Sequence, residues 1–92
     1  MLLIRYHEHF RFEPHEGAYF WMADGSIPIL CKVSHEALRV RSVRDGANAT
    51  LPDTFRRHRE RIEAIAGQNY ALRRRPNDIV LVLTRDLAPP PM

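Results

Sequence analysis

The sequence predicts an α+β fold in which two helices pack on one face of a small antiparallel sheet. Three observations support this prediction. Two strand-like segments flank the dipeptide Asp24-Gly25, as in a β-hairpin. Two segments with helical spacing of apolar residues follow, and a short apolar run at residues 79–83 closes the pattern. The expected order is β-β-α-α-β.

The hairpin is expected over residues 18–23 and 27–33. Asp-Gly supplies the positive backbone angles of a tight turn, and Pro28 must lie at an edge or a strand start because it has no amide hydrogen. Residues 3–6 and 10–12 alternate in the same way, which leaves room for an N-terminal edge strand. Alternation assigns Ile27, Ile29, Cys31 and Val33 to the core, and Pro28, Leu30 and Lys32 to the other face.

The first helix is expected to begin after Ser34, whose hydroxyl can accept from an open amide, with Glu36 near the positive helix end. A surface loop is expected over residues 44–49. Thr50 and Asp53 form a candidate capping box for the main helix, which should run to about residue 72. Its apolar stripe consists of Leu51, Phe55, Ile62, Ala66 and Tyr70, with Arg59 among them.

Residues 73–77 should end the main helix, since basic side chains suit its carbonyl end and Pro76 cannot continue it. Residues 79–83 then read as a buried strand that joins the hairpin. We expect one domain over residues 1–87. The proline-rich residues 88–92 are expected to form a flexible tail.

Composition is that of an ordinary globular protein: 92 residues, 45% hydrophobic and 27% charged. Arg5 interrupts the first apolar run, so neither a secretion signal nor a membrane span is expected. Cys31 is the only cysteine, which excludes an internal disulfide and favours a cytoplasmic location. The net charge of +3 is low for a dedicated nucleic-acid-binding protein.

Three segments, CKVSHEAL, FRRHRERIEAIA and DIVLVLTRDL, follow one another at characteristic separations. Together they resemble short bacterial proteins of domain-of-unknown-function family 1488, over residues 17–87. Val33 stands where the family pattern Cys-x-Ile-Ser has isoleucine, and His58 and Arg59 match its helix pattern. The resemblance implies two helices against a small sheet. It implies no activity and assigns no catalytic residue.

A basic run on the main helix is a candidate nucleic-acid site, because arginines can follow phosphates. The alternative is a solvated helix face on which Asp53 pairs with Arg57, Arg56 with Glu60, and Arg59 with Glu63, all at i,i+4. The candidate contacts are Arg56, Arg57, Arg61, Arg73, Arg74 and Arg75.

His58 and Arg59 lie beside the apolar stripe and should be partly buried. Arg59 then needs partners, for which Asp86, Asp78 or open carbonyls near the hairpin are candidates. A structural brace is favoured over a ligand-binding role. A catalytic role with a carboxylate would require a concave pocket and a perturbed pKa at His58.

No metal or cofactor is expected. His7 with His9, and Cys31 with His35, could approach one another, but neither pair has the spacing of a metal motif. No nucleophile stands in a pattern with a base and an orienting group, so no enzyme activity is expected.

The aromatic residues Tyr19, Phe20 and Trp21 cannot all face one core, so one set must point to the other side of the sheet. That side is expected to be covered by a partner, either another protein or a second copy of the chain, or by the N-terminal segment instead. The leading hypothesis is a non-enzymatic binding or accessory protein that acts through this sheet face or the loop around Gly46. Nucleic-acid binding by the basic helix is the alternative.

Overall fold

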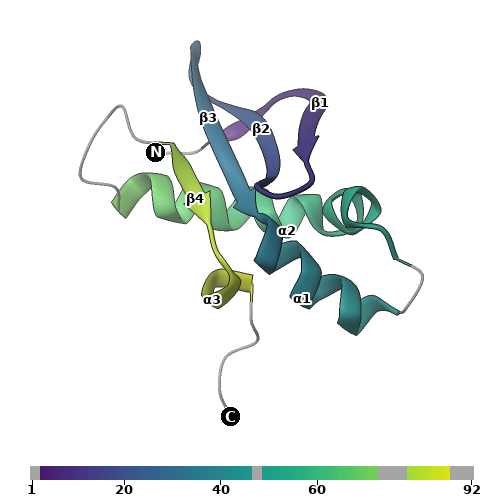
Figure 1. Ribbon diagram of the computed structural model, residues 1–92. Coiled ribbons are helices and arrows are strands. Elements are labelled where there is room, and N and C mark those ends of the chain that lie inside the picture. The colour runs from purple at the N-terminus through teal and green to yellow at the C-terminus, as the bar shows by residue number, and fades with distance from the viewer. Residues whose placement is uncertain (1–2, 47–48, 73–78, 88–92) are drawn as a thin grey trace.

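The computed structural model of the chain describes residues 3–46, 49–72 and 79–87 (Figure 1). Three strands come first, followed by two helices, a short strand and a short helix. They are β1 (Ile4–Glu13), β2 (Gly17–Asp24), β3 (Ile27–Ser34), α1 (His35–Asp45), α2 (Leu51–Leu72), β4 (Val80–Val82) and α3 (Thr84–Leu87). The predicted α+β class is confirmed, and the N-terminal edge strand is present as β1.

The four strands form one sheet in the order β1-β2-β3-β4. β1, β2 and β3 pair antiparallel, but β4 pairs parallel with β3, with Cys31 opposite Val80 and Val33 opposite Val82. The expectation of a wholly antiparallel sheet is therefore wrong in this pairing. The reason is the connection: α1 and α2 lie between β3 and β4 and return the chain to the beginning of β3, as a crossover requires.

The hairpin faces follow the predicted alternation with one exception. Ile29, Cys31 and Val33 are buried, whereas Ile27 is 59% exposed. Ile27 lies beside the turn, opposite Asp24, at the far end of the strand from α1. Gly25 takes the positive φ of 62° that the turn needs.

Both predicted helix starts are present. The amide of Ala37 donates to Ser34 Oγ at 3.1 Å, and the amide of Asp53 donates to Thr50 Oγ1 at 3.2 Å. The loop expected over residues 44–49 is shorter than predicted, because α1 continues to Asp45. Gly46 then ends α1, and its amide donates to Ser42 O at 3.1 Å.

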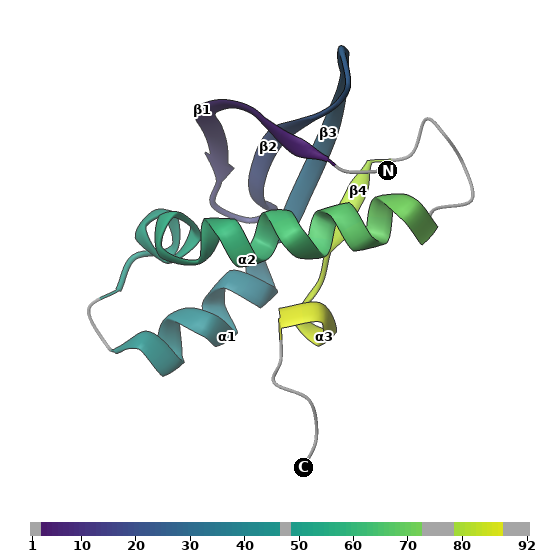
Figure 2. The same ribbon diagram turned by 180° about the vertical axis from the view of Figure 1, so that it is seen from behind.

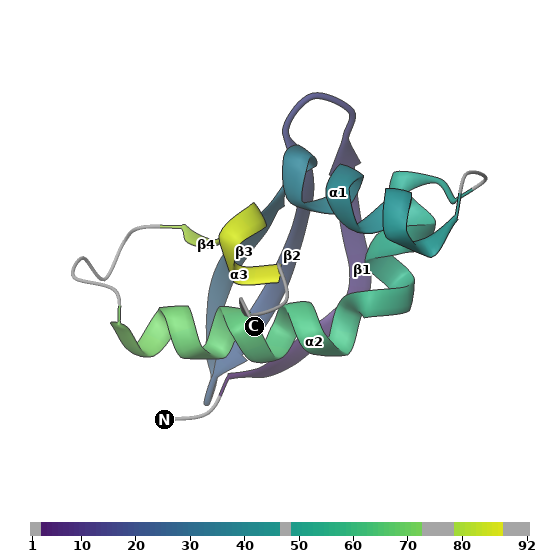
Figure 3. The same ribbon diagram turned by 90° about the horizontal axis from the view of Figure 1, so that it is seen from below.

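Helix α2 crosses the sheet on one face, and its buried residues make the centre of the core (Figure 2). Phe55 packs between Phe10 and Phe20, with ring centroids 4.4 and 5.4 Å away. α1 packs against α2, and α3 packs against α1, at the end of the sheet where β3 and β4 end (Figure 3). The opposite side of the sheet is called the open face below.

The closing strand is shorter than residues 79–83: Val80 and Val82 are buried, while Ile79 and Leu81 are 42% and 45% exposed. The four-residue helix α3 follows it and was not predicted. The expected helix end at residues 73–77 and the expected tail at 88–92 lie outside the described residues. No helix in the described ranges combines the length and the apolar character that crossing a membrane requires.

Candidate functional site

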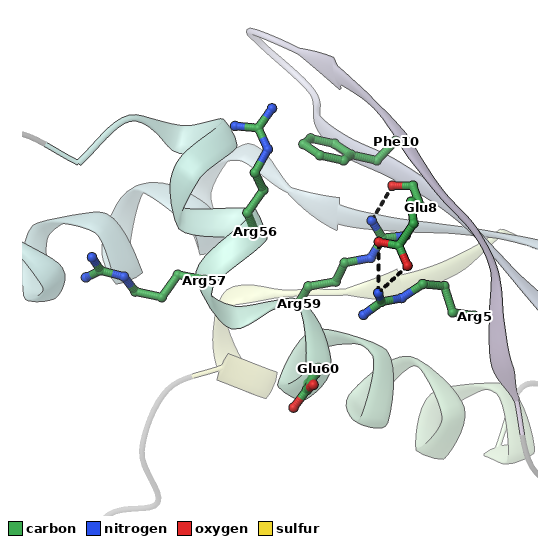
Figure 4. Close-up of a pocket in the computed structure, with 7 residues that line it drawn as sticks. All are labelled: Arg5, Glu8, Phe10, Arg56, Arg57, Arg59 and Glu60. Atoms are coloured by element: carbon green, nitrogen blue, oxygen red, sulfur yellow. Dashed lines mark hydrogen bonds and ion pairs between the residues drawn. The ribbon is translucent and has the colours of Figure 1, made fainter.

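Two hollows flank β1, one on each side of the sheet. The arginine groove lies between β1 and α2, has a volume of about 720 Å³, and is lined by Arg5, Glu8, Phe10, Arg56, Arg57, Arg59 and Glu60 (Figure 4). The aromatic hollow belongs to the open face, has a volume of about 290 Å³, and is lined by His7, His9, Phe10, Arg11, Tyr19, Trp21 and Leu30.

A large bulge in β1 contributes lining residues to both hollows. Arg5 lies opposite Met22 and Phe10 lies opposite Phe20, so the four residues 6–9 of β1 face the single residue Trp21 of β2. A bulge leaves backbone groups without partners in the sheet ladder. Here the carbonyls of two bulge residues turn toward α2.

Arg59 binds those carbonyls. Its Nη1 donates to Glu8 O and its Nη2 donates to His7 O at 2.9 Å, while its Nε donates to Glu63 Oε2 at 3.1 Å. The residue is only 6% exposed, and no buried side-chain nitrogen or oxygen lacks a partner in the described part of the chain. Arg59 therefore ties the β1 bulge to α2.

Arg5 completes an ion-pair network around Glu63. Its Nε donates to Glu63 Oε2 at 2.8 Å and its Nη1 donates to Glu8 Oε1 at 2.9 Å. Hydrogen bonds to Glu63 and then to Glu8 raise the pKa of Arg5, and the bond from Arg5 lowers the pKa of Glu8. Because the Glu8 side chain is 82% exposed, this bond contributes little to stability, and what it contributes is lost as pH falls through the lowered pKa of Glu8.

The donors of Arg5 and Arg59 are thus occupied by the protein itself. Arg56 donates to Asp53 Oδ1 at 2.8 Å and lies over the Phe10 ring, 5.2 Å from its centroid. Arg57 points away from Arg59 in Figure 4 and bonds to no partner in the described residues. The arginine groove therefore has no converging set of open donors, although four arginines line it.

The predicted i,i+4 pairs are partly wrong. Arg59 does pair with Glu63, but Asp53 pairs with Arg56 at i,i+3 and not with Arg57. Side chains three residues apart and side chains four residues apart both meet on a helix. The guanidinium of Arg56 stacks on the Phe10 ring, and this contact favours pairing of Asp53 with Arg56 over pairing with Arg57. Arg57 and Arg61 remain exposed on α2, and Arg73, Arg74 and Arg75 lie outside the described residues.

His58 lines neither hollow. Its Nε2 lies 2.6 Å from Asp45 Oδ2, and both side chains are mostly buried, at 15% and 13% exposure. A carboxylate accepts, so Nε2 carries the proton in this bond. Arg41 Nε lies 3.5 Å from the same nitrogen, which cannot accept a second bond while it carries the proton. His58 thus joins α2 to the last residue of α1.

Of the two candidate metal pairs, His7 and His9 lie close together on β1. The rings of His7 and His9 lie 6.2 Å apart, and His7 Nδ1 lies 3.1 Å from His9 O. Cys31 is buried and His35 begins α1. No group of three or more histidine, cysteine or acidic side chains suited to a metal occurs within residues 3–46, 49–72 and 79–87.

Tyr19 and Trp21 lie on the open face, on the opposite side of β2 from Phe20. Phe20 is fully buried, whereas Trp21 is 37% exposed and Tyr19 is half-buried. Trp21 lies opposite Leu30 of β3. A large ring half in water on a central strand is typical of a contact surface.

The bulge and its ion pairs were missed by sequence reasoning, although the sequence carries a signal for them. Arg5 is an odd position on the helix-facing side of β1, as is the buried Leu3 just before the strand, while Phe10 and Phe12 are even positions on the same side. Strict alternation cannot put both pairs on one face, so an irregularity between them is required.

A four-stranded sheet with helices on one face and a ring-lined hollow on the other defines a small α+β domain with one sheet face that no described helix covers. The chain belongs to the family described as protein of unknown function (DUF1488), whose family model matches residues 10–83. This confirms the resemblance drawn from the three sequence segments. No curated protein and no solved structure matches the chain.

Proposed function

We propose that this protein is a non-enzymatic binding or accessory protein that acts through protein contacts on the open face of its sheet. The observation that carries the proposal is Trp21, 37% exposed on a central strand and lining the aromatic hollow. Tryptophan is among the residues that most often dominate the energy of protein interfaces. The proposed location is the bacterial cytoplasm, where a single cysteine stays reduced.

The aromatic hollow suits a protein partner. Its rings supply apolar area, and Leu30 extends that area onto β3. Ile4 and Leu81, 55% and 45% exposed, lie on the same face of the sheet toward its two edges. Exposed apolar side chains gathered on one face are characteristic of interaction sites.

The test is affinity capture from lysate with tagged wild-type protein, Trp21→Ala and the control Val43→Ala. Val43 is 75% exposed on α1, away from the open face. Capture is run with and without nuclease at two salt concentrations and read by mass spectrometry. We expect the wild type and Val43→Ala to capture the same partner protein in a nuclease-resistant way. Trp21→Ala should capture at least about tenfold less of it, as removal of an interface hot spot does.

Retention of the same protein by Trp21→Ala would contradict the open-face proposal. Sedimentation of the purified wild type identifies a second copy of the chain as the partner if the mass doubles and Trp21→Ala restores the monomer.

A second candidate function is nucleic-acid binding by the basic face of α2. The observation that favours it is the pair Arg57 and Arg61, both exposed one turn apart, with Arg57 free of partners in the described residues. We expect the logarithm of affinity for a labelled DNA duplex to fall against the logarithm of salt with a slope of about −2 for two contacts. Arg57→Glu, Arg61→Glu and Arg74→Glu together should abolish binding in fluorescence anisotropy. Absent or salt-independent binding would remove this candidate.

A further inference from the structure

The open face carries a row of three side chains across β1, β2 and β3. Arg11 lies opposite Tyr19, and Tyr19 lies opposite Lys32. The guanidinium of Arg11 lies 5.0 Å from the Tyr19 ring centroid and the Lys32 ammonium lies 5.3 Å from it. Because they come from strands on either side of β2, the two cations flank one ring.

This row is fixed in place by local bonds. The Tyr19 hydroxyl donates to Glu16 Oε1 at 2.7 Å, which holds the ring, and the ring holds both cations by cation–π attraction. Two like charges at one ring also repel each other. A carboxylate placed between the two cations, beside the edge of the ring, relieves that repulsion and gains two attractions.

The two cations are only weakly neutralised. Arg11 Nε pairs with Glu13 Oε1 at 3.2 Å, but the side chains are 67% and 38% exposed, a setting in which ion pairs contribute little. In the part of the chain that the structure describes, Lys32 forms no ion pair. Positive charge on this row is therefore available to a partner.

Next to this row lies the aromatic hollow. None of its seven lining residues is acidic, and Arg11 belongs both to the row and to the hollow. Its volume of about 290 Å³ is at the lower end of ligand pockets and fits a large apolar side chain. His7 and His9, two residues of the bulge, also line the hollow.

We propose that the partner binds the open face with an acidic segment, which inserts an apolar side chain into the aromatic hollow and sets carboxylates against Arg11 and Lys32. This inference rests on the proposed function, because it names the chemistry of the protein partner. Charge complementarity of this kind sets both the choice of partner and the rate of encounter.

The same row disfavours single-stranded nucleic acid as the occupant. Binding of that kind relies on bases that stack on exposed rings. The flanks of the Tyr19 ring are taken by Arg11 and Lys32, which leaves Trp21 as the one large open ring on the described part of β2.

The test uses two capped pentapeptides, one with a central phenylalanine between pairs of glutamates and one with lysines instead. Binding is followed by amide chemical shifts of the labelled protein and by fluorescence of Trp21, the only tryptophan. We expect the glutamate peptide to shift residues of β1, β2 and β3 on the open face and to change Trp21 emission. The lysine peptide should do neither.

Charge reversal then tests the row itself. Arg11→Glu with Lys32→Glu should weaken the glutamate peptide at least about tenfold, as loss of complementary charge does. Arg39→Glu is the matched control, because Arg39 is exposed on α1 and touches neither row nor hollow. It should leave the affinity unchanged.

Equal binding of both peptides, shifts outside the open face, or a preference for a single-stranded oligonucleotide would overturn the acidic-segment proposal. Two further outcomes separate failure of this inference from failure of the proposed function. If lysate capture depends on Trp21 while neither peptide binds, the open face is an interface but its partner is not an acidic segment. If the glutamate peptide binds and Trp21→Ala captures the same proteins from lysate, the peptide site is real but is not the surface used for capture.

Discussion

Arg59 is an arginine in a stripe of apolar residues, and its environment explains why it is there. An apolar side chain at this position would leave the carbonyls of His7 and Glu8 facing α2 without donors. Buried carbonyls without partners are costly. A guanidinium can reach both carbonyls and Glu63 at once because its donors form a planar fork.

We expect Arg59→Ala to lower the free energy of unfolding by about 3 kcal/mol, the scale for breaking a buried pair. Arg59→Lys should lose about 1–2 kcal/mol, since one ammonium cannot replace all three bonds. The control Arg57→Ala should change stability by less than about 0.5 kcal/mol, because Arg57 is exposed. Urea unfolding measures all three. A loss at Arg59→Ala no larger than at Arg57→Ala would show that the contact to β1 contributes nothing.

At this scale the sequence predicted that Arg59 is partly buried and needs partners, with Asp86, Asp78 or open carbonyls near the hairpin as candidates, but not which of these it binds. Asp86 instead accepts from the amide of Leu83 and from Asn69, and Asp78 lies outside the described residues. Helical spacing fixes the face of α2 on which a side chain lies. It does not say which strand meets that face, because this depends on the register of the whole sheet.

At the scale of elements, the position of the beginning of β2 depends on a single residue, Gly17. Gly17 has a φ of 122°, and a Cβ there would lie 2.0 Å from Val33 O and 2.8 Å from His35 N. The backbone of β2 thus passes directly against the junction of β3 and α1. The amide of His35 donates to Glu16 O at 3.1 Å across the same junction.

Gly17→Ala should destabilise the protein by roughly 3 kcal/mol or more, since backbone strain and a clash with backbone atoms add. For a domain of this size that corresponds to a fall in Tm of about 15 °C. Gly25→Ala is the control: its φ is also positive, at 62°, but no atom lies within 4 Å of the added Cβ. It should cost about 1–2 kcal/mol. Similar Tm values for the two variants in thermal unfolding would refute the close approach at Gly17.

Element prediction succeeded where a local signal exists. Ser34 and Thr50 fix the helix starts because capping needs only neighbours in sequence. The direction of β4 was not predictable in this way. Nothing within residues 79–83 distinguishes parallel from antiparallel pairing, which is decided by the path of the two helices before it.

For the whole molecule, the sequence predicted the layers and the class of fold, and the structure confirms both. It also predicted that one of two aromatic sets must leave the core, and the structure identifies Tyr19 and Trp21 as that set. The hollow beside them was beyond prediction. It depends on the β1 bulge, which is stabilised by contacts between residues more than fifty positions apart.

The parallel strand β4 also affects the order in which the protein acquires its structure during synthesis. β1, β2, β3 and both long helices leave the ribosome before Val80 and Val82 do. Until then the edge of β3 has no neighbour, and the buried Cys31 and Val33 lie next to open backbone groups. An unpaired edge is a template for another chain. Because β4 is what covers that edge, we expect a chain that ends after α2 to aggregate more readily than the full chain.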